Sequence, residues 1–99
     1  MSAQISVDRR KIADFCRRRH IRKFALFGSV LRDDFRPDSD VDVLVIFEPG
    51  HTPGLTFFSM AEELTKILGR NVDLQTPQFL SRYFRDQVLA QAEVQYAES

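Results

Sequence analysis

The seven residues VDVLVIF, at positions 41–47, constrain the fold of this chain more than any other segment. They carry one polar residue, Asp42, and an otherwise unbroken run of β-branched, aliphatic and aromatic side chains, which is typical of a strand in the middle of a sheet. Asp40 comes directly before this strand. Ionised carboxylates at the edge of a buried strand are costly unless a cation or hydrogen-bond donors meet them. The two aspartates are therefore expected to bind something.

The rest of the chain alternates between helical and strand patterns. Apolar spacing and turn residues predict six further elements: a helix over 7–19 capped by Ser6 or Asp8, a strand over 22–27, a short helix over 29–35, a helix from 55 to 68, a strand over 70–76 and a helix from 80 to 96. This order predicts a small α/β unit of two or three layers.

Length and composition predict one globular domain over residues 1–99. The chain is 43% hydrophobic and 28% charged, which is ordinary for a globular protein. No apolar run approaches the ~20 residues that a membrane-spanning helix needs, and the N-terminal segment lacks the apolar core of a signal peptide. We expect a cytoplasmic location. The single cysteine, Cys16, is predicted to be a plain core residue.

The charges are unevenly placed although the formal net charge is +0. That balance argues against binding nucleic acid by bulk electrostatics, so nucleic acid is an unlikely direct substrate. Eight of the 14 basic residues nevertheless lie between Arg9 and Lys23. On a helix they most simply form a solvated face, and a surface for RNA or for an acidic protein partner is the alternative.

Three acids are placed so that they could hold a metal ion. Asp40 and Asp42 are two residues apart on a strand, so they point to the same face, roughly 7 Å apart. Asp73 interrupts the apolar pattern of the next predicted strand. If the two strands are neighbours, the three carboxylates converge and repel one another without a counter-ion. Mg²⁺ suits such a set because it prefers oxygen ligands and keeps substrate phosphates in its shell. Asp73 is the best candidate for receiving a proton.

A phosphate site is predicted at the turn that follows the first strand. Gly28 permits close approach, Ser29 can donate its hydroxyl, and the free N–H groups of a helix start favour anions. Arg32 can reach the same anion or brace a neighbouring acid, and Ser39 can contact phosphate or simply hydrogen-bond its own loop. Metal ligands and phosphate-binding groups that face one cleft are what an enzyme needs for in-line displacement at phosphorus.

The motif that joins these residues resembles the signature of minimal nucleotidyltransferases, in the DNA polymerase beta superfamily. The resemblance is carried by Gly28, Ser29, Arg32, Asp34, Pro37, Ser39, Asp40 and Asp42, then VLVIF and Asp73. It implies a mixed β-sheet flanked by helices, with ATP as nucleotide donor. It also implies Mg²⁺ held by Asp40, Asp42 and Asp73, and Gly28 and Ser29 at the triphosphate.

Stand-alone members of this family are antitoxins paired with a HEPN-domain ribonuclease toxin, onto a tyrosine of which they transfer AMP. The resemblance thus implies a protein adenylyltransferase that forms a hetero-oligomer with its toxin. A chain of this length is expected to lack a second lobe for an acceptor, so the acceptor would bring its own surface. Two alternatives stay open: a non-catalytic antitoxin that blocks the toxin by occlusion, and a nucleotidyltransferase acting on a small molecule or an RNA end.

The two histidines are not predicted to be metal ligands. His20 stands where relatives usually have glycine before the first strand, so a left-handed backbone is expected there, at a small cost. His51 lies in a loop rich in proline and glycine. No partner for His51 is predicted at ligand spacing.

Overall fold

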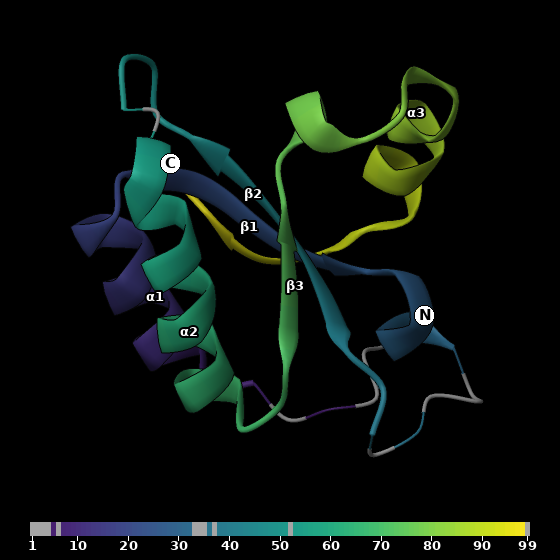
Figure 1. Cartoon of the computed structure of the whole chain (residues 1–99), viewed down its shortest axis with the longest axis horizontal. Coiled ribbons are helices and arrows are strands. Elements are labelled where there is room, and N and C mark those ends of the chain that lie inside the picture. Colours follow the sequence, from purple (N-terminus) through teal and green to yellow (C-terminus); the bar gives the residue numbers. More distant parts are fainter. Residues whose placement is uncertain (1–4, 6, 33–35, 37, 52, 99) are drawn as a thin grey trace.

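The computed structural model describes residues 5, 7–32, 36, 38–51 and 53–98, without the side chain of Ser29. Its helices are α1 (Arg9–Arg18), α2 (Phe57–Leu68) and α3 (Arg82–Gln91). Its strands are β1 (Ile21–Phe27), β2 (Val41–Phe47), β3 (Val72–Gln75) and β4 (Glu93–Ala97). Short 3₁₀ helices η1 (Gly28–Leu31), η2 (Gly54–Thr56) and η3 (Pro77–Phe79) connect them. Figure 1 shows their arrangement.

The strands form one mixed sheet in the order β3-β2-β1-β4. β1 pairs antiparallel with both β2 and β4, whereas β2 and β3 are parallel and are joined by α2. The prediction of a small mixed sheet flanked by helices is confirmed. The bounds of β2 are those predicted from its apolar run, and its place between β1 and β3 explains why that run is apolar.

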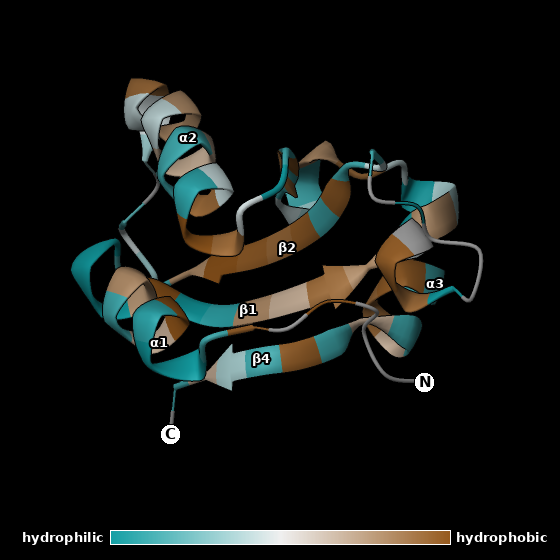
Figure 2. Cartoon of the chain, turned by 90° about the horizontal axis from the view of Figure 1, so that it is seen from below, coloured by the Kyte–Doolittle hydropathy of each residue, from teal (hydrophilic) through white to brown (hydrophobic). Residues whose placement is uncertain are grey.

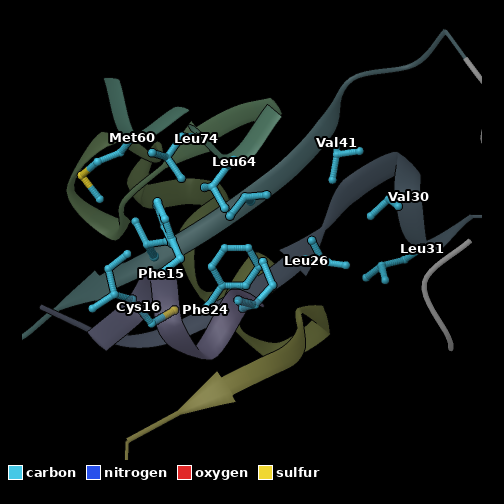
Figure 3. Packing of buried hydrophobic residues seen from close by; sticks show 14 residues of the cluster. Phe15, Cys16, Phe24, Leu26, Val30, Leu31, Val41, Met60, Leu64 and Leu74 are labelled. Carbon is cyan, nitrogen blue, oxygen red and sulfur yellow. The ribbon is translucent and has the colours of Figure 1, made fainter. Parts of the chain in front are cut away.

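The core lies between the sheet and the two helices α1 and α2, which cover the same face (Figures 1 and 2). α1 begins at Asp8, whose carboxylate accepts hydrogen bonds from the backbone N–H groups of Arg10 and Lys11. This confirms one of the two predicted caps. α1 buries Phe15 and Cys16 against Phe24 and the inward side chains of β2 (Figure 3).

Cys16 is a core residue, as predicted. Its side chain is fully buried, and burial raises the pKa of the thiol from 9.0 to about 12, although nearby Arg17 opposes the shift. A thiol with so high a pKa stays protonated near neutral pH, so it is a poor nucleophile.

The last part of the chain differs from the prediction of one helix from 80 to 96. α3 ends at Gln91, Ala92 is extended (φ −62°, ψ 136°), and β4 follows. The alternation of Val94 and Tyr96 with polar neighbours is equally compatible with a strand. Pairing with β1 decides between the two, because an unpaired edge of β1 would leave backbone groups without partners.

α3 lies on the side of the sheet opposite α1 and α2 (Figures 1 and 2). None of its residues is buried, and Tyr83 and Phe84 are 86% and 62% exposed. Both aromatic side chains of this helix are therefore largely open to solvent. No helix among the described residues is long and apolar enough to cross a membrane.

Candidate active site

Asp42 and Asp73 lie side by side on the face of the sheet opposite α1 and α2. They are register partners on the parallel strands β2 and β3, and register partners point to the same face. Their neighbours in β2, Val41 and Val43, alternate to the other face, where they are fully buried in the core. The prediction required β2 and β3 to be adjacent, and they are.

Gly28 adjoins Asp42 from the other side. It follows β1, whose last residue, Phe27, pairs with Asp42. The backbone of Gly28 is left-handed (φ 73°), and an added Cβ atom would overlap the Asp42 carboxylate. Both facts require glycine here. The backbone of Gly28, just after β1, therefore lies on one side of Asp42, and Asp73 of β3 lies on the other.

Asp40 lies directly before β2 and is exposed, two residues from Asp42. Asp73 is also exposed, and one of its oxygens, Oδ1, accepts a hydrogen bond of 2.8 Å from the side-chain amide of Gln75. Sequence reasoning missed Gln75. The signal was present, because Gln75 is two residues after Asp73 on a strand and must share its face.

The predicted phosphate-binding residues lie around η1 and the loop that follows it. Ser29 is in η1, but its side chain is outside the described part of the structure. Arg32 is exposed and makes no ion pair with any described residue. The Ser39 hydroxyl accepts a hydrogen bond from the Arg36 N–H, and the Ser39 N–H donates to the Arg36 carbonyl, so Ser39 braces its own loop.

The residues present fit a hard divalent cation such as Mg²⁺. Asp40, Asp42 and Asp73 offer only carboxylate oxygens, and two of them are held in register on neighbouring strands. The three acids do not form a compact ligand group of the kind that the described residues contain elsewhere. The predicted convergence of the three carboxylates is therefore not found at ligand distance, although β2 and β3 are neighbours.

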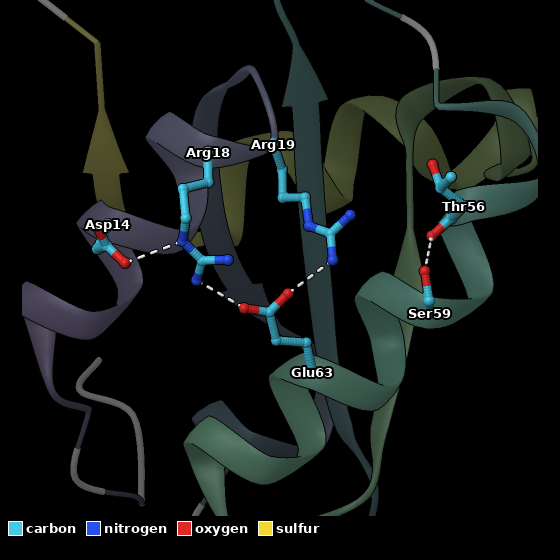
Figure 4. A network of polar contacts seen from close by, with 6 residues as sticks. All are labelled: Asp14, Arg18, Arg19, Thr56, Ser59 and Glu63. Carbon is cyan, nitrogen blue, oxygen red and sulfur yellow. Dashed lines mark hydrogen bonds and ion pairs between the residues drawn. The ribbon is translucent and has the colours of Figure 1, made fainter.

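Two of the basic side chains at the C-terminal end of α1 form ion pairs with acidic side chains. Arg18 donates to Asp14 and to Glu63 of α2, and Arg19 donates to the other oxygen of Glu63 (Figure 4). Hydrogen bonds to Glu63 and then to Asp14 raise the pKa of Arg18. Burial opposes ionisation of Glu63, but the bonds from Arg19 and Arg18 prevail and lower its pKa. This network clamps α1 to α2.

A pocket of about 620 Å³ lies at the other end of β2 and β3 from the acids. Apolar side chains predominate in its lining, including Phe47, Phe57, Phe58 and Phe79. Phe57 and Phe79 contact each other edge to face, with ring centroids 5.6 Å apart. None of the predicted metal-binding acids or phosphate-binding residues lines this pocket, so the pocket is separate from the predicted site.

Solved structures of known proteins share this fold. A candidate minimal nucleotidyltransferase is 37% identical with a TM-score of 0.71, covering 85% of both chains. A toxin–antitoxin complex with AMP-PNP is 22% identical (TM-score 0.74; 94% of this chain and 76% of that chain). A complex of a tri-AMPylated Shewanella oneidensis HEPN toxin with its MNT antitoxin is 23% identical (TM-score 0.66; 90% and 69%). The last two likenesses establish the fold alone.

Sequence comparison identifies the family. A candidate protein adenylyltransferase of Methanocaldococcus jannaschii is 30% identical over 84 residues, which are 85% of this chain and 89% of that protein. The family model described as a nucleotidyltransferase domain matches residues 9–95. This match runs from the start of α1 into β4 and includes the paired acids Asp42 and Asp73. The chain therefore belongs to the nucleotidyltransferase domain family, among its minimal nucleotidyltransferases.

Proposed function

We propose that this chain is an antitoxin that transfers AMP from ATP to a tyrosine of a HEPN-domain ribonuclease toxin and so neutralises it. The observation that carries the proposal is the register of Asp42 with Asp73 beside the side-chain-free backbone of Gly28. The acids suit the metal ion that accompanies a nucleoside triphosphate, and the backbone of Gly28 lets the phosphates come close because no side chain is in the way. The names of the relatives, a candidate protein adenylyltransferase and an MNT antitoxin with an AMPylated toxin, support the same activity.

The transfer is a displacement at the α-phosphorus of ATP. The tyrosine oxygen forms a new bond to that phosphorus, the bond to the bridging oxygen breaks, and pyrophosphate leaves with the electron pair. Asp73 is our candidate for accepting the tyrosine proton. The Gln75 amide fixes one of its oxygens, which restricts the rotation of the carboxylate. A carboxylate with a fixed orientation costs less entropy to align with an incoming hydroxyl.

ATP and Mg²⁺ are assigned to the two halves of the site. Asp40, Asp42 and Asp73 would hold Mg²⁺, which when bound supplies positive charge to the phosphate oxygens. Gly28, Ser29 and the exposed Arg32 would contact the triphosphate. Ser39 would act by keeping the loop in shape, because its hydroxyl is already engaged with Arg36.

The exposed aromatic side chains favour a protein as the acceptor. Phe58, Phe79, Tyr83 and Phe84 are each more than 60% exposed. Apolar patches of this kind mark protein contact surfaces, where aromatic residues are enriched. A hetero-oligomer with the toxin would cover such side chains, and the toxin would bring its own acceptor tyrosine to the site.

The test is label transfer from α-labelled ATP. The purified chain is incubated with Mg²⁺ and a HEPN-domain ribonuclease encoded beside it, and label in protein is followed. We expect the natural chain to label the ribonuclease and to inactivate it. Asp42→Asn should do neither, whereas Asp86→Asn, which changes an exposed acid of α3, should do both.

Each alternative function predicts a different result of the same experiment. Neutralisation by Asp42→Asn without label on the ribonuclease would identify an antitoxin that acts by occlusion. Label on RNA or on a small molecule, with none on protein, would identify the third function. Either outcome overturns the proposal.

A further inference from the structure

A second group of metal-ligating side chains lies at the end of the sheet remote from Asp42. His20 precedes β1, Glu48 follows β2, and His51 lies in the loop after Glu48. One ring nitrogen of each histidine and one carboxylate oxygen of Glu48 lie within 4.8 Å of one another. The described residues contain no other group of three ligand-type side chains so close together.

The backbone holds these residues in place. The Glu48 N–H donates to the His20 carbonyl (2.8 Å), which extends the pairing of β1 with β2 by one residue. The His51 N–H donates to the Glu48 carbonyl (3.1 Å) and closes a four-residue turn. Pro49 and Gly50, the latter with φ 82°, occupy its central positions, as a type II turn requires. The turn therefore brings Glu48 and His51 to the same side of the chain.

In the described part of the chain, no polar side chain is bonded to the side chains of His20, Glu48 or His51. Within the described residues, the half-buried Glu48 carboxylate makes no hydrogen bond or ion pair. The nearby cations Arg18 and Arg19 are bound to Glu63 instead. The rings of His20 and His51 stack, with centroids 4.0 Å apart and planes 14° apart. Two imidazoles and a carboxylate therefore lie close together, and no described residue occupies their ligand atoms.

The backbone of His20 adds an independent observation. It has φ 59°, and among the described residues it is the one non-glycine residue with positive φ. Such a conformation is unfavourable for a side chain with a Cβ atom, and residues held in it cluster at functional sites. An imidazole therefore occupies a position at which glycine would be easier to accommodate.

We propose that His20, Glu48 and His51 bind a zinc ion, with water as the fourth ligand. Two histidines and one glutamate with an open position are an established zinc donor set, whereas Mg²⁺ prefers oxygen ligands. Zinc bonds of about 2.0–2.1 Å place tetrahedral ligand atoms roughly 3.4 Å apart. The ligand atoms, which all lie within 4.8 Å of one another, must therefore take up this spacing, and both histidines are exposed and can turn out of their stack.

The bound ion would link the end of α1 to the turn after β2. That turn forms part of two pockets, because Gly50 and Pro53 line both the apolar pocket and a smaller one beside Arg18 and His51. Zinc would therefore fix the wall between the two pockets. This role is separate from nucleotidyl transfer, since the acids of the active site lie at the other end of β2.

The two histidines permit a direct test by nuclear magnetic resonance, because the chain has no others. Zinc is added to protein carrying Asp42→Asn and Asp73→Asn, so that the active-site acids do not compete. We expect both pairs of imidazole signals to shift together and to saturate at one equivalent of zinc. An unchanged spectrum, or a shift of one histidine alone, would refute a shared site.

Variants separate ligation from folding. His20→Gly removes a ligand but suits the left-handed backbone, so it keeps the fold while abolishing the response of His51. Glu48→Gln should weaken zinc binding by about tenfold or more. Its matched control, Glu62→Gln on α2, should leave affinity unchanged. Equal affinity in Glu48→Gln and Glu62→Gln would overturn the assignment of Glu48.

Discussion

Asp42 and Asp73 are register partners on the only parallel strand pair among the described residues, although they are separated by a whole helix in the sequence. The parallel pairing places these two acids at adjacent positions on one face of the sheet. A slip of one residue in this register would send Asp73 to the core face, where Leu74 now packs. The position of the acids is therefore coupled to the packing of α2 and β3 on the core.

Mg²⁺ should stabilise the protein through these acids. An ion that binds only the folded state at 100 times its Kd adds about 2.7 kcal/mol to the free energy of unfolding. We expect Mg²⁺ to raise the Tm of the natural chain but not that of Asp42→Asn. Thermal unfolding with and without Mg²⁺ measures this effect, and an equal rise in Asp42→Asn would contradict the assignment.

Gly28→Ala should damage both stability and activity. The left-handed backbone alone costs a residue with a Cβ atom about 1–2 kcal/mol. The new Cβ atom would also displace the Asp42 carboxylate. Gly54→Ala is the matched control, since Gly54 has φ 61° but open space around it. Urea unfolding should show similar losses of stability in both variants, whereas label transfer should fail in Gly28→Ala only.

Gln75→Met should slow nucleotidyl transfer without unfolding the chain. Methionine has a similar volume but cannot donate to Asp73 Oδ1, so the carboxylate loses its fixed orientation. Groups that orient a reacting or ligating side chain are typically worth about tenfold or more. We therefore expect about a tenfold lower rate with an unchanged Tm. Gln87→Met, on the exposed surface of α3, is the control. A rate equal to that of the natural chain would exclude a positioning role for Gln75.

Sequence reasoning predicted the elements whose signals are local. The apolar run of β2 gave its exact bounds, and Asp8 is the cap of α1. β4 was missed because its strand character depends on pairing with β1, which lies about 70 residues earlier. The contact of His20 with His51 was missed for the same reason: the pairing of β1 with β2 creates it, and no spacing along the chain reveals it.

Glu63→Gln should destabilise the fold at neutral pH and much less in acid. Hydrogen bonds from Arg19 and Arg18 outweigh burial and lower the pKa of Glu63 in the folded state. The ionised form therefore stabilises the fold above the ordinary glutamate pKa near 4.5, and this contribution disappears as the pH falls through the lowered value. Because Glu63 and its arginine partners are partly exposed, we expect Glu63→Gln to lower the free energy of unfolding at neutral pH by about 1 kcal/mol or less.

Urea unfolding of the natural chain and Glu63→Gln at pH 7 and pH 3 measures this difference. The gap in the free energy of unfolding should be larger at pH 7, and 1 M salt should reduce it there, because salt screens exposed charges. Glu62→Gln, on the same helix and exposed, should show no such gap. A gap that grows toward pH 3 would contradict an ionised Glu63 bound to Arg18 and Arg19 in the folded state (Figure 4).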